Sequence, residues 1–128
     1  MISRIVMASV IGLSLTGMAM ADTGPLKGPA LKRTLSNKTL HLNTPLGVTM
    51  PIKFRRNGTM IGRAKPALAR YTGSKRDKGV WWIKGNRVCQ KWRRWLSGRS
   101  YCFSLHMRGR MVYWRRNDGR TGTGIISQ

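Results

Sequence analysis

The pattern of apolar and polar positions along the chain predicts short β-strands separated by tight turns. From Val48 to Arg55, Val, Met, Ile and Phe occupy every second position, which is typical of a strand with one buried face. Pro51 lies within this run and favours a sheet edge or a bulge, because proline donates no ladder hydrogen bond. Asn57-Gly58 then indicates a hairpin turn, so Thr59–Arg63 is predicted to return antiparallel to the first strand.

The same alternation of strands and turns continues towards the end of the chain. Residues 64–78 are polar, basic and irregular, and we interpret them as a loop. The strands predicted after this loop are Gly79–Lys84, Arg87–Trp92, Tyr101–Arg108, Met111–Arg115 and Thr121–Ile126. The sequence therefore predicts an all-β fold of about eight short antiparallel strands, arranged as a sandwich or a meandering barrel.

The N-terminal residues have the composition of an export signal. Met1–Arg4 is short and basic, Ile5–Thr16 is uncharged and mostly apolar, and Ala19-Met20-Ala21 supplies small residues at the cleavage site. This order is typical of a secretory signal peptide and predicts a periplasmic or secreted protein. The alternatives are an uncleaved anchor or a buried N-terminal helix, although a membrane span needs about 20 apolar residues.

The rest of the chain is predicted to form one domain that starts with an arm. Asp22–Ala30 is rich in Pro and Gly, which favours a flexible segment. Leu31–Leu35 has the spacing of a short helix, so residues 22–38 are interpreted as arm and helix. Residues 39–128 are then the β-domain.

Cys89 and Cys102 are the two cysteines of the chain, and they lie on predicted strands on either side of an Arg93–Gly98 loop. In an exported protein a lone pair of cysteines favours a disulfide. If the two strands pair, the midpoint between the cysteines falls inside the loop and the cysteines face each other. Such a bridge would stabilise the fold by about 3 kcal/mol. Free thiols or part of a metal site are the alternatives.

The net charge is the feature of the composition that bears most on the function of the chain. The chain has 25 Lys and Arg against three acidic residues, and its net charge is +22. So few carboxylates cannot neutralise the cations, so the surface potential must be strongly positive. Such a surface attracts polyanions: nucleic acid, lipopolysaccharide, anionic glycan or anionic lipid. The alternative is that the basic residues serve solubility alone.

Candidate catalytic groups are few. Acid–base catalysis needs paired carboxylates or a histidine with a partner, but Asp22, Asp77 and Asp118 are far apart in the chain. Ser104 and His106 share one strand face without an acid nearby to orient the histidine. Cys89, Cys102 and His106 do not have the spacing of a standard zinc site. We therefore predict a non-enzymatic protein without metal or cofactor.

The best candidate for a binding site is the basic segment Lys84–Arg99, in which Lys and Arg are interleaved with Trp. Arg115 and Arg116, which follow Trp114, repeat this pattern. Guanidinium groups bind phosphate or sulfate in a bidentate way, and unpaired cations avoid burial. The loop arginines are therefore predicted to be exposed. The residues predicted to bind a polyanion are Lys91, Arg93, Arg94, Trp95, Arg99, Arg115 and Arg116.

The tryptophans in and around this segment have two interpretations. Tryptophan rings stack on bases or sugars and lie at lipid headgroups. Alternatively, Trp81, Trp92 and Trp114 fill the core. Trp95 follows Arg94 in a predicted loop, so it is the tryptophan most favoured for an exposed position.

Several structural motifs occur in one order along the chain. They are Asn57-Gly58-Thr59-Met60, Gly79-Val80-Trp81, Ile83, Gly85, Cys89, Trp92, Cys102 and Asn117-Asp118-Gly119. In this pattern the chain resembles a group of small, exported, largely uncharacterised alphaproteobacterial proteins. The resemblance covers roughly Leu35 to Ile126, and it implies a calycin-like β-barrel with Cys89 and Cys102 bridged. It implies no catalytic residue. This chain is more basic than the proteins of that group and has Lys78 where an acid is expected. The resemblance therefore does not imply that it shares a ligand with them.

Three functions are compatible with these observations. The leading hypothesis is an exported, non-enzymatic basic protein that binds an anionic polymer or a membrane surface such as lipopolysaccharide. The alternative is a lipocalin-like carrier, because an eight-stranded barrel holds one small apolar ligand or is filled by its own side chains. Nucleic-acid binding is the third hypothesis, and it applies if the chain is not exported.

Overall fold

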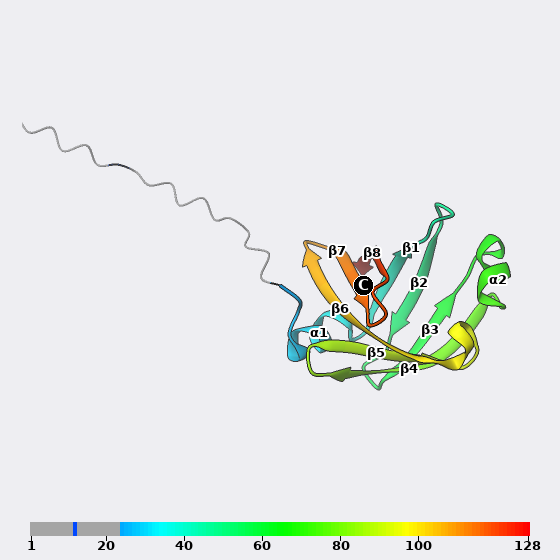
Figure 1. Cartoon of the computed structure of the whole chain (residues 1–128), viewed down its shortest axis with the longest axis horizontal. Helices are drawn as coiled ribbons and strands as arrows, with labels where there is room; N and C mark the ends of the chain where they lie inside the picture. The colour runs from blue at the N-terminus through cyan, green and yellow to red at the C-terminus, as the bar shows by residue number, and fades with distance from the viewer. Residues whose placement is uncertain (1–11, 13–23) are drawn as a thin grey trace, which may run out of the picture.

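Eight antiparallel strands form a closed barrel in which each strand pairs with its neighbours in sequence and β8 pairs with β1 (Figure 1). The computed structural model describes Gly12 and residues 24–128. The strands are β1 (Lys38–Asn43), β2 (Thr49–Phe54), β3 (Thr59–Arg63), β4 (Arg76–Lys84), β5 (Arg87–Trp92), β6 (Ser100–Arg108), β7 (Met111–Arg116) and β8 (Thr121–Ser127). The all-β prediction is confirmed, and the meandering barrel is the correct arrangement of the two.

The helix α1 (Gly28–Leu35) closes one end of the barrel. Its residues Leu31 and Leu35 are fully buried. The helix begins earlier than predicted, because proline suits the first turn of a helix and Pro29 occupies that turn. The predicted signal peptide, Met1–Ala21, lies outside the described residues except for Gly12.

The described part of the predicted flexible arm is bound to the barrel. The Leu26 N–H donates to the carbonyl oxygen of Leu105 at 2.8 Å. The Gly28 N–H donates to Asn86 Oδ1 at 3.0 Å. Leu26 and Gly28 therefore connect the end of the arm to the barrel just before and at the start of α1.

Residues 64–78 contain a helix and the start of a strand, so their interpretation as a loop is wrong. The helix α2 (Pro66–Thr72) begins with proline and ends at Gly73, whose φ of 86° is left-handed. These are the positions that favour proline and glycine at helix ends. The helix lies at the end of the barrel opposite α1, beside the short 3₁₀ helix η1 (Trp95–Gly98) (Figure 1).

Cys89 and Cys102 are direct partners across β5 and β6, and they form a disulfide. The pairing predicted from the loop midpoint is therefore confirmed. The same register places Gln90 opposite Tyr101 and Lys91 opposite Ser100. Residues at odd and even positions of β5 face opposite sides of the sheet.

Tryptophans fill much of the barrel interior. Trp81 and Trp92 are buried, as their interpretation as core residues requires. Trp81 meets Phe54 edge to face with ring centroids 5.5 Å apart, and its Nε1 donates to the carbonyl oxygen of Arg55 at 2.8 Å. Gly62 leaves room for the rings of Trp92 and Trp95, because a Cβ at this position would overlap them.

Candidate functional site

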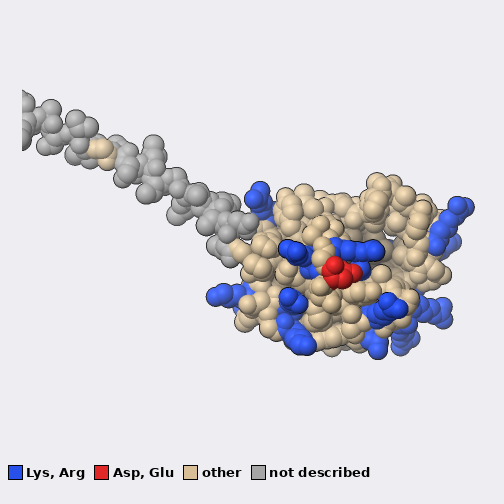
Figure 2. All heavy atoms as spheres, viewed as in Figure 1, with Lys and Arg blue, Asp and Glu red and all other residues tan. Residues whose placement is uncertain are grey.

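The basic side chains cover the outside of the barrel without internal neutralisation. Among the described Lys and Arg residues, all but Lys38 and Arg116 are exposed. The described aspartates are engaged elsewhere: Asp77 is buried, and Asp118 pairs with Arg116. Figure 2 shows basic groups spread around the acidic group on the visible face. The exposed cations of the described chain therefore have no carboxylate partner among the described residues.

Asp77 holds the backbone of the basic loop in place. Its side chain is 6 % exposed. Oδ2 accepts the N–H groups of Arg94 and Trp95 at 2.9 and 2.8 Å, while Oδ1 accepts the N–H of Lys78 at 2.9 Å. Because the carboxylate binds backbone donors, it leaves the arginine side chains free. Lys91, Arg93, Arg94 and Arg99 are all exposed, as predicted.

Trp95 is buried, which corrects the expectation that it is exposed in the loop. It is 2 % exposed, its ring lies 4.7 Å from the ring of Trp92, and its Nε1 donates to Ser74 Oγ at 3.0 Å. Leu96 and Ser97 have left-handed φ values of 54° and 55°. This turn directs the Trp95 ring into the mouth of the barrel, so Trp95 cannot stack on a polyanion at the surface.

A hollow of about 430 Å³ lies on the outer side of β3, β4 and β5. In the sheet register, Lys78 is opposite Ile61, and Val80 is opposite Lys91. Cations and apolar side chains therefore alternate between neighbouring strands. We call this feature the cationic groove. Its basic residues are Arg55, Lys78, Lys91 and Arg93, and the apolar residues that it presents at the surface include Ile61 and Val80.

The two arginines at the end of β7 have different environments, since successive residues of a strand face opposite sides. Arg115 is exposed on the outer face. Arg116 faces inward: its Nε and Nη2 donate to Asp118 at 2.8 and 2.6 Å, and its guanidinium lies 4.1 Å from the ring centroid of Tyr101. The hydrogen bonds that Arg116 donates to Asp118 raise the pKa of Arg116, and they lower the pKa of Asp118 to about 2.

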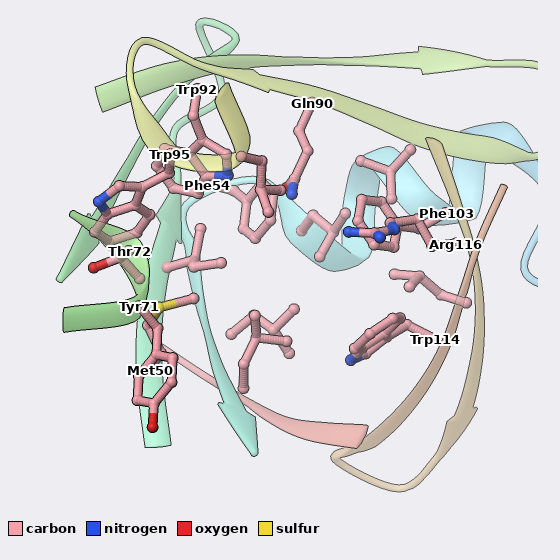
Figure 3. A pocket seen from close by; sticks show the side chains of 17 residues that line it. Met50, Phe54, Tyr71, Thr72, Gln90, Trp92, Trp95, Phe103, Trp114 and Arg116 are labelled. Carbon is pink, nitrogen blue, oxygen red and sulfur yellow. The ribbon is translucent and has the colours of Figure 1, made fainter. Parts of the chain in front are cut away.

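A cavity of about 320 Å³ lies inside the barrel (Figure 3). Leu35 of α1 lines it at the closed end, and Tyr71 and Leu96 line it at the end of α2 and η1. Leu96 is 43 % exposed and Tyr71 is also exposed, so the cavity reaches solvent at that end. The remaining lining is mostly apolar and includes Leu40, Ile52, Val88, Phe103 and Leu105.

Gln90 places an amide group in this apolar cavity. The residue is 8 % exposed, and its side chain has no hydrogen-bond partner among the described residues. Figure 3 shows it pointing into the interior, as does the guanidinium of Arg116. Trp114 also lines the cavity, and its Nε1 is buried without a partner among the described residues.

The described residues contain little that resembles a catalytic or metal site. His41 Nε2 and Ser127 Oγ lie 2.8 Å apart across β1 and β8, but both described aspartates are engaged at other places. Within residues 24–128, no three His, Cys, Asp or Glu side chains are grouped so that they could hold a metal ion. The described helices are all too short or too polar to cross a bilayer.

Sequence reasoning missed residues at both sites. Arg55 and Lys78 join Lys91 and Arg93 only because β4 pairs with β3 on one side and with β5 on the other. The alternation of Val88, Gln90 and Trp92 on the buried face of β5 was the signal for an interior polar group at Gln90. Comparisons of this chain with protein-family models, with curated proteins and with solved structures find no match.

Proposed function

We propose that this protein is an exported, non-enzymatic binding protein whose cationic groove and basic loop dock on a phosphate-bearing anionic lipid surface such as lipopolysaccharide. The observation that carries the proposal is the register that sets Lys78 beside Ile61 and Lys91 beside Val80. A purely polar polyanion would use only the cations. The apolar side chains between them favour a ligand with acyl chains beside its phosphates.

The charge of the groove is large enough to matter. A basic residue near an anionic membrane contributes roughly 1 kcal/mol, so the basic residues of the groove together contribute on the order of a few kcal/mol. Exposed cations of one sign also raise the rate of encounter with an anionic surface. Both effects are screened by salt, because the Debye length is about 10 Å at 0.1 M ionic strength.

The test measures binding of the purified protein to vesicles that contain lipopolysaccharide or phosphatidylglycerol, with phosphatidylcholine vesicles as the neutral reference. We expect binding to the anionic vesicles that weakens steeply with salt. The double variant Lys78→Gln and Lys91→Gln should weaken it more than Lys27→Gln and Lys32→Gln, which remove the same charge at α1. Equal losses, or binding that does not depend on salt, would contradict the groove.

A second variant separates lipid from other polyanions. Ile61→Thr with Val80→Thr keeps every cation and the β-branched shape but makes the groove more polar. We expect weaker binding to anionic vesicles and unchanged binding to soluble polyphosphate. If both ligands respond equally, the partner is a polar polyanion such as an anionic glycan.

Export is part of the proposal, and two features support it: the order of basic, apolar and small residues in Met1–Ala21, and the Cys89–Cys102 disulfide. Intact-mass analysis of the protein from its native host tests it directly. We expect the mass of Asp22–Gln128 less two hydrogens for the Cys89–Cys102 bridge. The mass of the full chain with two free thiols would contradict export and would favour nucleic acid as the partner.

A second candidate function is carriage of a small, mostly apolar ligand inside the barrel. The interior cavity of about 320 Å³ favours it, because ligand pockets are commonly of about 300 to 1,000 Å³ and lined by apolar and aromatic side chains. Titration with a small apolar fluorophore tests it. The same fluorescence in the presence and absence of protein would argue against an accessible interior.

A further inference from the structure

We propose that the barrel interior binds a small aliphatic carboxylic acid, with its carboxylate at Gln90 and Arg116 and its hydrocarbon chain among the apolar side chains that line the cavity. The proposal rests on the second candidate function and names its class of ligand. It concerns the inside of the barrel, so it is independent of the cationic groove on the outside.

The first step is the amide of Gln90, which has no hydrogen-bond partner among the described residues. Its side chain is more than nine-tenths buried and points into a cavity whose lining is mostly apolar. The amide faces this cavity, and polar groups inside proteins almost always have a hydrogen-bond partner. A ligand polar group in the cavity would supply the partner that the described residues do not.

The second step is the position of Arg116 relative to Gln90. Gln90 is the direct partner of Tyr101 across β5 and β6, and the Arg116 guanidinium lies over the Tyr101 ring at 4.1 Å. Gln90 on β5 and Arg116 on β7 therefore lie on either side of β6, and Figure 3 shows both side chains pointing into the barrel interior. Asp118 takes Nε and Nη2 of Arg116, while Nη1 has no hydrogen-bond partner among the described residues.

The third step is the chemistry that these groups select. The amide and the free guanidinium nitrogen offer N–H donors, and none of the described residues that line the cavity is a carboxylate. A carboxylate accepts such hydrogen bonds, and charge-assisted bonds are the stronger ones. Arg116 is the only cation among the lining residues and is already half engaged by Asp118. A head group with one negative charge therefore fits better than a phosphate with two.

The fourth step is the room for the hydrocarbon chain. Arg116 pairs with Phe103, which pairs with Val88, so Arg116 lies further from η1 than the pair of Gln90 and Tyr101 does. The apolar lining around these polar groups includes Leu35, Leu40, Ile52 and Leu105. A short hydrocarbon chain fits this apolar part of the cavity.

The experiment titrates the purified protein with decanoate and with decanol, which have the same chain and differ in the head group. Trp92, Trp95 and Trp114 line the cavity, so intrinsic tryptophan fluorescence reports occupancy. We expect decanoate to bind about tenfold or more tightly than decanol, because it gains the charged hydrogen bonds. High salt suppresses adsorption of decanoate to the outer cations.

The variant Gln90→Leu keeps the size of the side chain and removes its amide. We expect it to bind decanoate about tenfold more weakly, to bind decanol as the natural protein does, and to melt at the same or a higher temperature. A merely structural role for Gln90 would lower the melting temperature instead. Thr49→Val, a matched polar-to-apolar change at an exposed position of β2, should alter neither ligand's affinity.

Equal affinity for decanoate and decanol, or an unchanged decanoate affinity in Gln90→Leu, would overturn the proposal. The groove variant Lys78→Gln with Lys91→Gln should bind decanoate like the natural protein, although it binds anionic vesicles more weakly. A protein that binds vesicles but not decanoate would refute the interior site and leave the surface function standing. Loss of decanoate binding in the groove variant would show that the acid binds outside the barrel.

Discussion

The carboxylate of Asp77 on β4 accepts the backbone N–H of Trp95 at 2.8 Å, and so fastens the start of η1 to the barrel. The acid also serves Arg94 and Lys78. Its role is structural, because the donors that it binds are the backbone N–H groups of Lys78, Arg94 and Trp95. In a chain with three acidic residues, one of them is used to shape the loop that carries the exposed arginines.

Replacement of Asp77 by alanine should therefore lower the free energy of unfolding by about 3 kcal/mol, because it leaves several backbone N–H groups without an acceptor in a buried place. Urea denaturation followed by tryptophan fluorescence measures the change. Asp118→Ala removes an exposed acid and is the control, with an expected effect of less than about 1 kcal/mol. Similar losses in both variants would show that Asp77 contributes only its charge.

The exposed arginines of the loop provide a second prediction. Arg93→Glu with Arg94→Glu should weaken binding to anionic vesicles and flatten its salt dependence without unfolding the barrel, since both side chains face solvent. Lys27→Glu with Lys32→Glu makes the same change in net charge at α1. The salt dependence of vesicle co-sedimentation distinguishes them. If both double variants lose the same affinity, binding is diffuse attraction to a basic surface.

The third prediction concerns the disulfide between β5 and β6. Replacement of Cys89 and Cys102 together by serine should lower the free energy of unfolding by about 3 kcal/mol, because the bridge limits the entropy of the unfolded chain. Cys89 is fully buried, so the buried hydroxyl adds a smaller penalty. The measurement is urea unfolding of the natural protein with and without reductant, beside the double variant. Identical midpoints with and without reductant would disprove the contribution.

The fourth prediction concerns how the contribution of the Arg116–Asp118 pair to stability depends on pH. The hydrogen bond from Arg116 lowers the pKa of Asp118 from 3.8 to about 2. Because the folded pKa is the lower one, the pair's contribution is complete above about pH 4 and is lost as the pH falls through about 2. An NMR titration of the Asp118 carboxyl carbon should show this midpoint. In Arg116→Gln the midpoint should return towards 3.8, and an unchanged midpoint would exclude the arginine as the cause.

Local sequence determined much of this protein. The period-two alternation of Val48 to Phe54 and the Asn57-Gly58 turn were sufficient to predict β2, β3 and their hairpin, because backbone preferences and strand period act over a few residues. The spacing of Cys89 and Cys102 predicted their pairing for the same reason. Net charge predicted the exposed cations, since few carboxylates leave most cations in water.

Only the tertiary structure decided which residues meet across the barrel. Trp95 turned inward because Leu96 and Ser97 adopt left-handed backbone conformations that other residues of the fold select. Arg55 and Lys78 lie beside Lys91 and Arg93 because β3, β4 and β5 pair in register. Tyr101 is the partner of Gln90 across β5 and β6, and its ring contacts the guanidinium of Arg116. Periodicity assigns a residue to one face of a strand, but the closure of β8 on β1 determines whether that face encloses a cavity.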